Sequence, residues 1–240
     1  MLPADMTTEK QIDNPNVTVV LFDIDGTMIN SSGAGGSALL MALEAEFSVA
    51  SPLAVELHGR TDSGIFRELL EVNGVEPTNE NYRRLCLRYF NMLPGVLETR
   101  ETEPLVGVRK LVEGMDAGSQ FALGLLTGNL PESAKMKLEH FGLAHYFAAG
   151  TFGDAARHRP GLRDSALATA RKLAGGTVEK KRIVVVGDTP LDIELAKVMQ
   201  VRCLAVATGG YSAADLSEAG ADRALDDLTD TADVMQWCLS

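Results

Sequence analysis

The chain has 240 residues, 45% of them hydrophobic, which is enough for one large domain or for a core with a modest second unit. Its 33 Asp and Glu outnumber its 22 Lys and Arg, so the formal net charge is -11. Such an acidic chain is a poor partner for nucleic acid or for an anionic membrane, and we expect neither. An anionic small substrate would need local positive charge, from a metal ion and a few basic side chains.

The cysteines and the N-terminal residues indicate a compartment. Cys86, Cys203 and Cys238 form no C-x-x-C pair and have no zinc-ligand spacing, which predicts a reducing environment without a disulfide framework. Residues 1–16 are polar, and no later stretch approaches the roughly eighteen apolar residues that span a bilayer. We therefore expect a cytoplasmic protein, whose oligomeric state the sequence leaves open.

Strand and helix patterns alternate along most of the chain. Apolar or β-branched runs predict buried strands at Val17–Phe22, Phe121–Leu126, Ile183–Val186 and Cys203–Ala207, and a weaker one at Tyr146–Ala149. Between them lie helical patterns, each long enough for a crossover between parallel strands, at Pro131–Phe141, Leu162–Ala174 and Pro190–Met199. This alternation is typical of an α/β fold with a doubly wound, Rossmann-like parallel sheet.

A long insertion separates the first two strands. Residues 33–102 are almost wholly helical in pattern, and Ser37–Phe47 is apolar nearly all round, as in a helix buried between neighbours. A second helix has one buried stripe, formed by Tyr82, Leu85, Cys86, Tyr89, Phe90 and Leu93. We expect a small helical cap domain at 33–102, inserted into an α/β core of residues 1–32 and 103–240. The hinges are expected near Ser31–Gly36 and Glu101–Pro104.

The first strand ends in a pair of acidic residues. Asp23 and Asp25 are two apart on an extended segment, so their side chains point the same way at the carboxyl end of the sheet, where open α/β folds bind ligands. Two carboxylates that close repel each other unless a cation or a proton lies between them. Gly26 permits a sharp turn before Thr27. The alternative is a strand that simply ends in an Asp-Gly turn.

The second strand is followed by Thr127, Gly128 and Asn129, and then by a helical pattern. A hydroxyl and free backbone N–H groups at the start of a helix can bind phosphate oxygens. The alternative is a capping box, with Asn129 as N-cap and Glu132 three residues later.

A third acidic cluster follows the strand Ile183–Val186. Thr189 and Asp192 fit a helix cap, but Asp188 precedes the cap at the strand end, where a carboxylate needs a charge partner. Mg²⁺ prefers a few carboxylate oxygens, water and a substrate phosphate, and the carboxylates of Asp23 and Asp188 with the carbonyl of Asp25 could supply such a set.

These motifs, D-x-D-G-T at 23–27, Thr127, and G-D-x-x-x-D at 187–192, follow in order on three strands. The chain thereby resembles the haloacid dehalogenase-like hydrolase superfamily, and within it the phosphoglycolate phosphatase-like group with a helical cap. The resemblance implies Mg²⁺ as cofactor, Asp23 as nucleophile and Asp25 as general acid and base. It implies that Thr127 binds a phosphate oxygen, that Asp188 is a metal ligand and that Asp192 supports the metal site. Gly26, Thr27, Gly128 and Asn129 are expected to bind substrate.

The resemblance also implies a basic residue that neutralises the nucleophile and the transferring phosphoryl group. The family usually has Lys followed by Pro, whereas this chain has several arginines in the corresponding stretch. The following Pro160 favours Arg159, with Arg157 and Arg163 as rivals. Arg can hold phosphate oxygens through two hydrogen bonds, so it is a reasonable replacement for Lys.

The cap sequence His58–Asp62 resembles a loop that closes over the substrate in phosphoglycolate phosphatase-like proteins. Arg60 could bind the non-phosphate end of the substrate, or Thr61 could simply cap the helix that follows. Taken together, these features predict a Mg²⁺-dependent phosphatase for a small phosphorylated metabolite, with phosphoglycolate-like compounds favoured. A sugar-phosphate mutase, a pyrophosphatase or a nucleotidase of the same fold are alternatives, and a non-catalytic binding module ranks below them.

Overall fold

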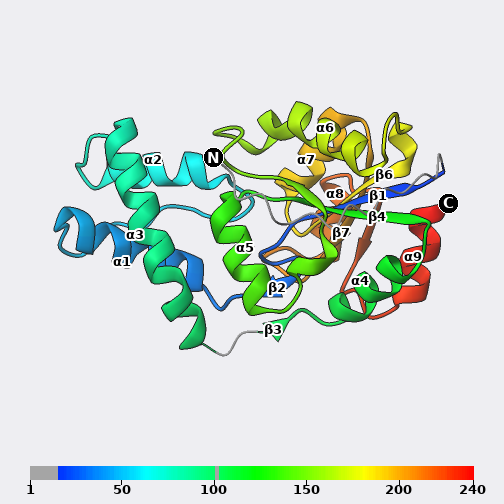
Figure 1. Ribbon diagram of the computed structural model, residues 1–240, viewed down its shortest axis with the longest axis horizontal. Coiled ribbons are helices and arrows are strands. Elements are labelled where there is room, and N and C mark those ends of the chain that lie inside the picture. Colours follow the sequence, from blue (N-terminus) through cyan, green and yellow to red (C-terminus); the bar gives the residue numbers. More distant parts are fainter. Residues whose placement is uncertain (1–15, 101–102) are drawn as a thin grey trace.

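The computed structural model describes residues 16–100 and 103–240. Its main sheet has six strands, all parallel, in the order β5-β4-β1-β6-β7-β8 (Figure 1). The strands are β1 (Thr18–Phe22), β4 (Phe121–Leu126), β5 (Ala149–Thr151), β6 (Ile183–Gly187), β7 (Arg202–Val206) and β8 (Arg223–Leu225). The order reverses on either side of β1, which places a ligand-binding crevice at the carboxyl end of this strand. The predicted fold class is confirmed.

Helices cover both faces of this sheet. Side chains alternate along β1, so Val20 and Phe22 pack on one face while Val19 and Leu21 pack on the other. The first face is covered by α4 (Val108–Ala117), α5 (Pro131–His140) and α9 (Thr231–Leu239). The second is covered by α6 (Arg163–Leu173), α7 (Pro190–Met199) and α8 (Ala213–Glu218). Burial on both faces explains why the central strands are continuous apolar runs.

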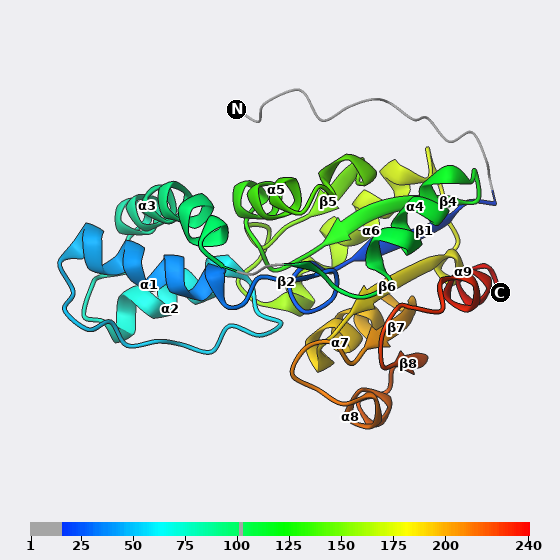
Figure 2. The same cartoon turned by 90° about the horizontal axis from the view of Figure 1, so that it is seen from below.

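The insertion after the first strand is a group of three helices at one end of the molecule (Figure 2). These are α1 (Ala34–Phe47), α2 (Asp62–Val72) and α3 (Asn79–Glu98), which share a hydrophobic cluster of their own. Cys86 belongs to that cluster, as its place in the apolar stripe predicts. Residues 48–61 form an irregular loop, so the insertion is less helical than its sequence pattern indicates. We call the three helices and this loop the cap; its boundaries at 33 and 102 stay a prediction.

Two short strands connect the cap to the core. β2 (Ile29–Asn30) pairs antiparallel with β3 (Glu103–Pro104). The expected hinge at 101–104 lies partly outside the described residues, because 101 and 102 are not among them.

One strand prediction was wrong in its bounds, and one strand was missed. The expected strand at Tyr146–Ala149 begins only at Ala149, because residues Ala144–Tyr146 form a 3₁₀ turn. Strand β8 was not predicted, since only three residues pair with β7 at the edge of the sheet.

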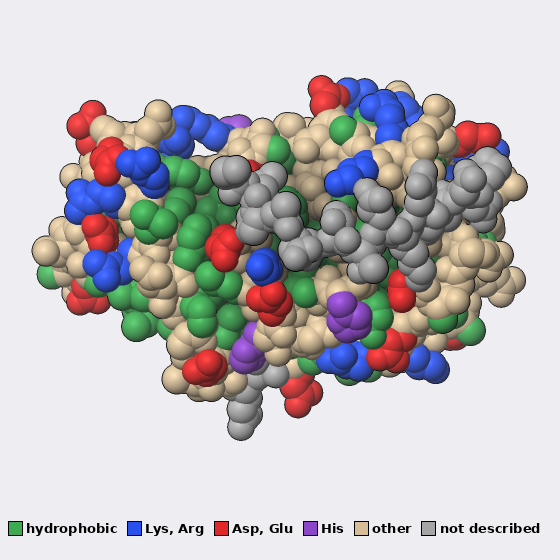
Figure 3. All heavy atoms as spheres, in the orientation of Figure 1, with side chains coloured by type: hydrophobic (Ala, Val, Ile, Leu, Met, Phe, Trp, Pro, Cys, Tyr) green, Lys and Arg blue, Asp and Glu red, His purple; other side chains and the backbone are tan. Residues whose placement is uncertain are grey.

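The surface carries many charged side chains of both signs, as the 33 Asp and Glu and 22 Lys and Arg of the sequence lead one to expect. Acidic and basic side chains are interspersed over the face seen in Figure 3. Among residues 16–100 and 103–240, no helix is long and apolar enough to cross a membrane. The three cysteines are buried and unpaired.

Candidate active site

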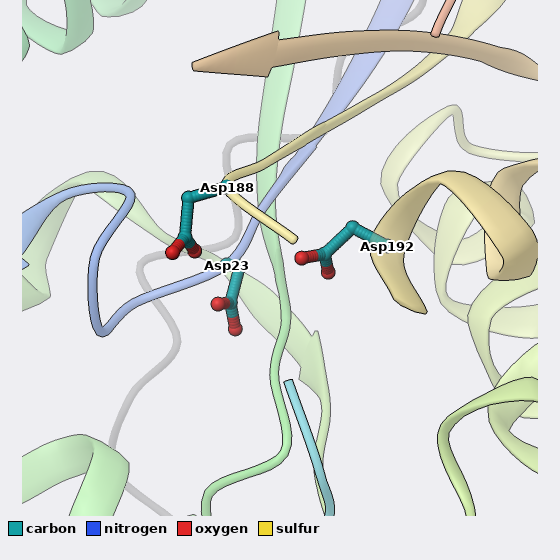
Figure 4. A group of neighbouring side chains, drawn as sticks. All are labelled: Asp23, Asp188 and Asp192. Atoms are coloured by element: carbon teal, nitrogen blue, oxygen red, sulfur yellow. The ribbon is translucent and has the colours of Figure 1, made fainter. Parts of the chain in front are cut away.

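The strand register brings the acidic residues together. Phe22 of β1 pairs with Val186 of β6, so Asp23 and Asp188 follow at neighbouring strand ends. The backbone N–H of Asp23 donates to the carbonyl oxygen of Val186 at 2.9 Å, which fixes this register. Asp192 lies in the first turn of α7, directly after β6. One carboxylate oxygen from each of the three residues lies within 4.8 Å of the others, and the side chains converge in Figure 4.

Arg159 is the cation of this cluster. Its side chain is 2% exposed, and its Nη2 lies 3.0 Å from Asp23 Oδ1 and in closer contact with Asp192. The same nitrogen donates to the carbonyl oxygen of Leu126, at the end of β4, at 3.2 Å. Burial disfavours the charged guanidinium, but Asp192 and Asp23 outweigh it and raise the pKa of Arg159. The side chain is therefore permanently charged.

One nitrogen of Arg159 is unsatisfied. Its Nε is buried and has no hydrogen-bond partner among the residues that the structure describes. A buried N–H without an acceptor is costly, and such groups are rare in folded proteins.

Ionisation of the carboxylates in this cluster is unfavourable, as the pKa values of Asp23 and Asp188 show. Burial raises the pKa of Asp23, Arg159 lowers it, and Asp192 and Asp25 raise it further. Burial also raises the pKa of Asp188, and the charges of Asp23 and Asp192 add to that effect. One arginine thus does not neutralise three carboxylates. A divalent cation beside Asp23 and Asp188 would, and their oxygen donors suit a hard cation.

Asp192 is held by the protein itself. Its Oδ2 accepts hydrogen bonds from the Thr189 backbone N–H at 3.1 Å and from the Thr189 hydroxyl at 2.7 Å. The Asp192 backbone N–H donates to the Thr189 hydroxyl oxygen at 3.4 Å, so the expected helix cap forms as a capping box. Its other oxygen contacts Arg159, and the residue is fully buried. With both oxygens engaged, Asp192 orients the guanidinium of Arg159.

Asp188 is enclosed by small residues. The Thr27 hydroxyl donates to Asp188 Oδ1 at 3.0 Å. A Cβ added to Gly26, whose φ is +81°, would lie 2.3 Å from Asp188 Oδ2, and one added to Gly209 would lie 1.8 Å away. Only glycine fits at both positions. Thr27 therefore holds a metal-ligand candidate in place, and its expected contact with substrate stays a prediction.

Asp25 lies apart from the cluster, in contact with a residue that sequence reasoning missed. Lys137 Nζ donates to Asp25 Oδ2 at 2.5 Å and to Asn129 Oδ1 at 2.6 Å. Asn129 Nδ2 donates to the same Asp25 oxygen at 2.8 Å, and the Ser31 hydroxyl to the other oxygen at 3.3 Å. Burial alone would raise the pKa of Asp25, but Lys137 and these hydrogen bonds lower it.

The sequence contains a signal for Lys137. It lies three residues after Ala134 and four after Ser133, on the buried face of α5, where a lysine is unusual. Side chains on a helix lean toward its N-terminus, so a long one on this face reaches back to the loop after β4.

The loop after β4 carries the other predicted phosphate contacts. Thr127 is fully buried, and its hydroxyl oxygen accepts from the Asn129 backbone N–H at 3.2 Å and from Asn129 Nδ2 at 2.9 Å. The capping box expected for Asn129 and Glu132 does not form, because the N-cap residue of α5 is Leu130 and the Asn129 side chain binds Asp25 instead.

A pocket of about 420 Å³ opens over these groups, between core and cap. Its core side includes Asp23, Asp25, Asp188, Gly128, Asn129, Lys137 and Arg159, and its cap side includes Leu39, Leu57, Arg60, Ile65, Phe66 and Tyr89. Arg60 donates to the carbonyl oxygen of Glu56 at 2.9 Å and forms an ion pair with Glu68, so part of its charge is already matched.

The rival arginines have other partners. Arg163 Nε donates to the carbonyl oxygen of Val198 at 2.9 Å, and its Nη1 pairs with Asp164. Arg157 contributes its backbone carbonyl, which accepts from the Thr61 hydroxyl at 2.7 Å. Of the three arginines considered, Arg159 is the one in contact with Asp23.

Comparison with known proteins identifies the family. A family model described as haloacid dehalogenase-like hydrolase matches residues 20–206. The chain is 29% identical over 224 residues to a phosphoglycolate phosphatase of Agrobacterium fabrum, covering 89% of this chain and 90% of that protein. A crystal structure of a hydrolase from Pseudomonas syringae superposes with a TM-score of 0.69 at 22% identity, covering 92% of this chain and 98% of that one. CbbY from Rhodobacter sphaeroides, solved with phosphate, gives a TM-score of 0.71 at 17% identity, covering 89% and 96% of the two chains. Because the family model spans most of its length, the chain belongs to the haloacid dehalogenase-like hydrolase family.

Proposed function

We propose that the protein is a Mg²⁺-dependent phosphomonoester hydrolase that forms a phosphoryl intermediate on Asp23. The observation that carries the proposal is the contact of Asp23 with the buried cation Arg159, in a pocket that Asp188 also lines. A phosphoryl group on Asp23 would lie beside this guanidinium, which can donate hydrogen bonds to its oxygens. Family membership and the likeness to a phosphoglycolate phosphatase support the same conclusion.

The first step transfers the phosphoryl group to the protein. A carboxylate oxygen of Asp23 attacks phosphorus, and the bond from phosphorus to the leaving oxygen breaks. Lys137 lowers the pKa of Asp25, so Asp25 must take up a proton when the ester binds; it then gives this proton to the leaving oxygen, and the product leaves as an alcohol. Arg159 binds the non-bridging oxygens, with Thr127, Gly128 and Asn129 of the loop after β4 as further expected contacts. The result is a mixed anhydride between Asp23 and phosphate.

The second step regenerates the protein. Asp25, now a carboxylate, accepts a proton from a water molecule while the water oxygen attacks phosphorus. The bond between phosphorus and the Asp23 oxygen breaks. Lys137 and Asn129 favour this form, because both donate to the Asp25 carboxylate. Asp23 returns to its ionised form, and inorganic phosphate is released.

The carboxylates of Asp23 and Asp188 and the carbonyl of Asp25 would hold Mg²⁺. When bound, this ion supplies charge that shields Asp23 from the phosphate it attacks. Asp192 supports the site through Arg159, as its two engaged oxygens indicate.

The substrate is a small phosphate ester, for which phosphoglycolate is the favoured candidate because the similar protein from Agrobacterium fabrum is a phosphoglycolate phosphatase. The pocket volume of about 420 Å³ suits a compact metabolite. Arg60 is the proposed contact for its non-phosphate end. Isomerisation of a sugar phosphate, or hydrolysis of pyrophosphate or a nucleotide, would use the same core residues. Experiment distinguishes these activities from hydrolysis of a small phosphate ester.

Phosphate release from a panel of phosphate esters, with Mg²⁺ and with a chelator, tests the proposal. We expect release that depends on Mg²⁺ and is fastest for phosphoglycolate or a similarly small anionic ester. Sugar phosphate that is isomerised without release would favour a mutase. Absence of turnover with every ester, p-nitrophenyl phosphate included, together with absence of Mg²⁺ binding, would favour a binding module.

Stability measurements on Asp188→Asn test the metal site separately from activity. The pKa of Asp188 is raised above its ordinary value of 3.8 in the folded protein, so its contribution to stability is present below about pH 4 and is lost as pH rises through the higher, folded-state pKa. In chelator, the variant should therefore unfold at a higher temperature than the wild type near pH 8, and at a similar temperature near pH 4.

Magnesium should reverse that order near pH 8, because it stabilises only the protein that retains the ligand. Thermal unfolding with Mg²⁺ and with chelator provides the measurement. A wild-type midpoint that does not respond to Mg²⁺, or an equal response in the variant, would contradict the assignment of Asp188 as a ligand.

A further inference from the structure

The first turn of α2, residues 61–64, lies against the two core loops that carry the predicted phosphate contacts, and we call it the latch segment. Asp62 belongs to the cap, yet its Oδ2 accepts from the backbone N–H of Leu130 at 2.8 Å and from the Ser133 hydroxyl at 3.2 Å, both in the core. Its own backbone N–H donates to the carbonyl oxygen of Gly128 at 2.7 Å. Asp62 thus binds the loop after β4 and the first turn of α5 with both its side chain and its backbone.

These contacts complete a helix cap that α5 lacks. Leu130 is its N-cap residue and provides no side-chain acceptor, and the third helical position is Ser133 instead of an acidic residue. In a capping box, an acidic side chain at that third position accepts from the N-cap backbone N–H. Here Asp62 supplies the carboxylate from the cap, beside the positive end of the helix dipole.

The latch segment also holds the loop that leads to Arg159. The Thr61 hydroxyl donates to the carbonyl oxygen of Arg157 at 2.7 Å, and the Ser63 hydroxyl to that of Ala156 at 2.9 Å. Both acceptors lie within three residues of Arg159 in the chain. The same turn of α2 therefore contacts the phosphate-binding loop and the loop of the buried arginine.

The packing at this junction leaves no room for side chains. A Cβ at Gly128 would lie 1.9 Å from the carbonyl oxygen of Arg60, and one at Gly64 would lie 2.4 Å from that of Arg157. The approach of cap and core is thus made backbone to backbone. Figure 2 shows α5 at the junction between the cap helices and the sheet.

We infer that Asp62 is a positioning residue: it caps α5 from the cap and holds the phosphate-binding loop in its working position only when cap and core are in contact. Its neighbours Thr61 and Ser63 hold the Arg159 loop in the same way. The inference rests on the proposed function in assigning these loops to phosphate. Separation of cap and core would leave the Leu130 N–H to water and free both loops, while the Ser133 hydroxyl would keep the Leu130 carbonyl oxygen as its acceptor. The closing of the cap onto the core and the ordering of the two loops are therefore coupled: each favours the other.

Amide hydrogen exchange of the full chain, with Asp62→Ala and Asp62→Asn, tests the inference. We expect about tenfold faster exchange for residues 127–133 in Asp62→Ala, because one capping contact is lost, while the amides of β1 exchange as in the wild type. Asp62→Asn keeps an oxygen that can accept from Leu130, so it should restore most of the protection. Glu71→Ala, an exposed carboxylate further along α2, is the matched control and should change nothing.

Kinetics provide the second readout. Asp62→Ala should lower kcat about ten- to a hundredfold, with a smaller change in KM, because misplaced loops cost the transition state more than the ground state. Thr61→Val with Ser63→Ala should instead accelerate exchange mainly at residues 155–159. Unchanged exchange at 127–133 in Asp62→Ala, acceleration spread over the whole core, or an Asp62→Asn variant as impaired as Asp62→Ala would overturn the inference. Exchange needs no substrate, so it decides the question even if no ester is hydrolysed.

Discussion

Replacement of Asp23 by Asn is expected to lower phosphate release by about 10⁴-fold or more, the loss typical of removing a covalent nucleophile. The amide has nearly the shape of the carboxylate and can still contact Arg159, but it cannot attack phosphorus. Asp23 is 5% exposed at the end of β1, so a nucleophile from bulk solvent cannot readily replace its carboxylate. Release of phosphate from a Mg²⁺-saturated sample measures the effect.

Folding controls for Asp23→Asn have a clear expected sign. The raised pKa of Asp23 means that its charge opposes folding in the absence of metal, so the neutral variant should unfold at an equal or higher temperature in chelator. Asp226→Asn, on the surface, is the matched control and should retain full activity. An Asp23→Asn variant that is folded and turns over at the wild-type rate would refute the assignment of the nucleophile.

Replacement of Arg159 by Met should cost both stability and activity. The guanidinium is the buried partner of Asp23 and Asp192, and its removal leaves these carboxylates without their cation. Breaking a buried ion pair from one side typically destabilises a protein by about 3–5 kcal/mol. Denaturant unfolding measures this free energy. Phosphate release measures the loss in kcat, which we expect to reach about 10²-fold or more because the positive charge that stabilises the transferring phosphoryl group is gone.

Two further variants make the Arg159 prediction specific. Arg159→Lys keeps the charge but cannot contact Asp23, Asp192 and the Leu126 carbonyl with one planar group, so it should recover only part of the stability. Arg163→Met removes an arginine whose side chain is 43% exposed and should change the free energy of unfolding by less than about 0.5 kcal/mol. Equal stability of Arg159→Met and Arg163→Met would contradict the role assigned to the buried cation.

Local sequence patterns were sufficient to predict the four central strands of the sheet and the acidic residues at strand ends. Phe121–Leu126 and Pro190–Met199 have the predicted bounds, because continuous apolar runs and a Pro at the first helical position mark elements whose ends are set locally. Asp23 and Asp188 could be placed together because parallel strands bring their carboxyl ends to one edge.

Contacts between distant segments could not be predicted in the same way. Lys137 reaches Asp25 from 112 residues away, and Asp62 caps a helix 68 residues later. The position of Lys137 on the buried face of a helix marks it as unusual, but nothing local identifies Asp25 as its partner. An aspartate after a threonine has an ordinary local explanation as part of a helix cap. The short strand β8 depends on pairing with β7 more than on its own sequence pattern.

The most direct measurement of the central claim is mass spectrometry of the wild-type protein quenched in acid during its first turnover with Mg²⁺ and an accepted phosphate ester. The peptide that contains Asp23 should carry one phosphoryl group, which disappears once the substrate is consumed. Phosphate released during that turnover while the peptide remains unmodified, or a phosphoryl group on another residue, would contradict nucleophilic attack by Asp23.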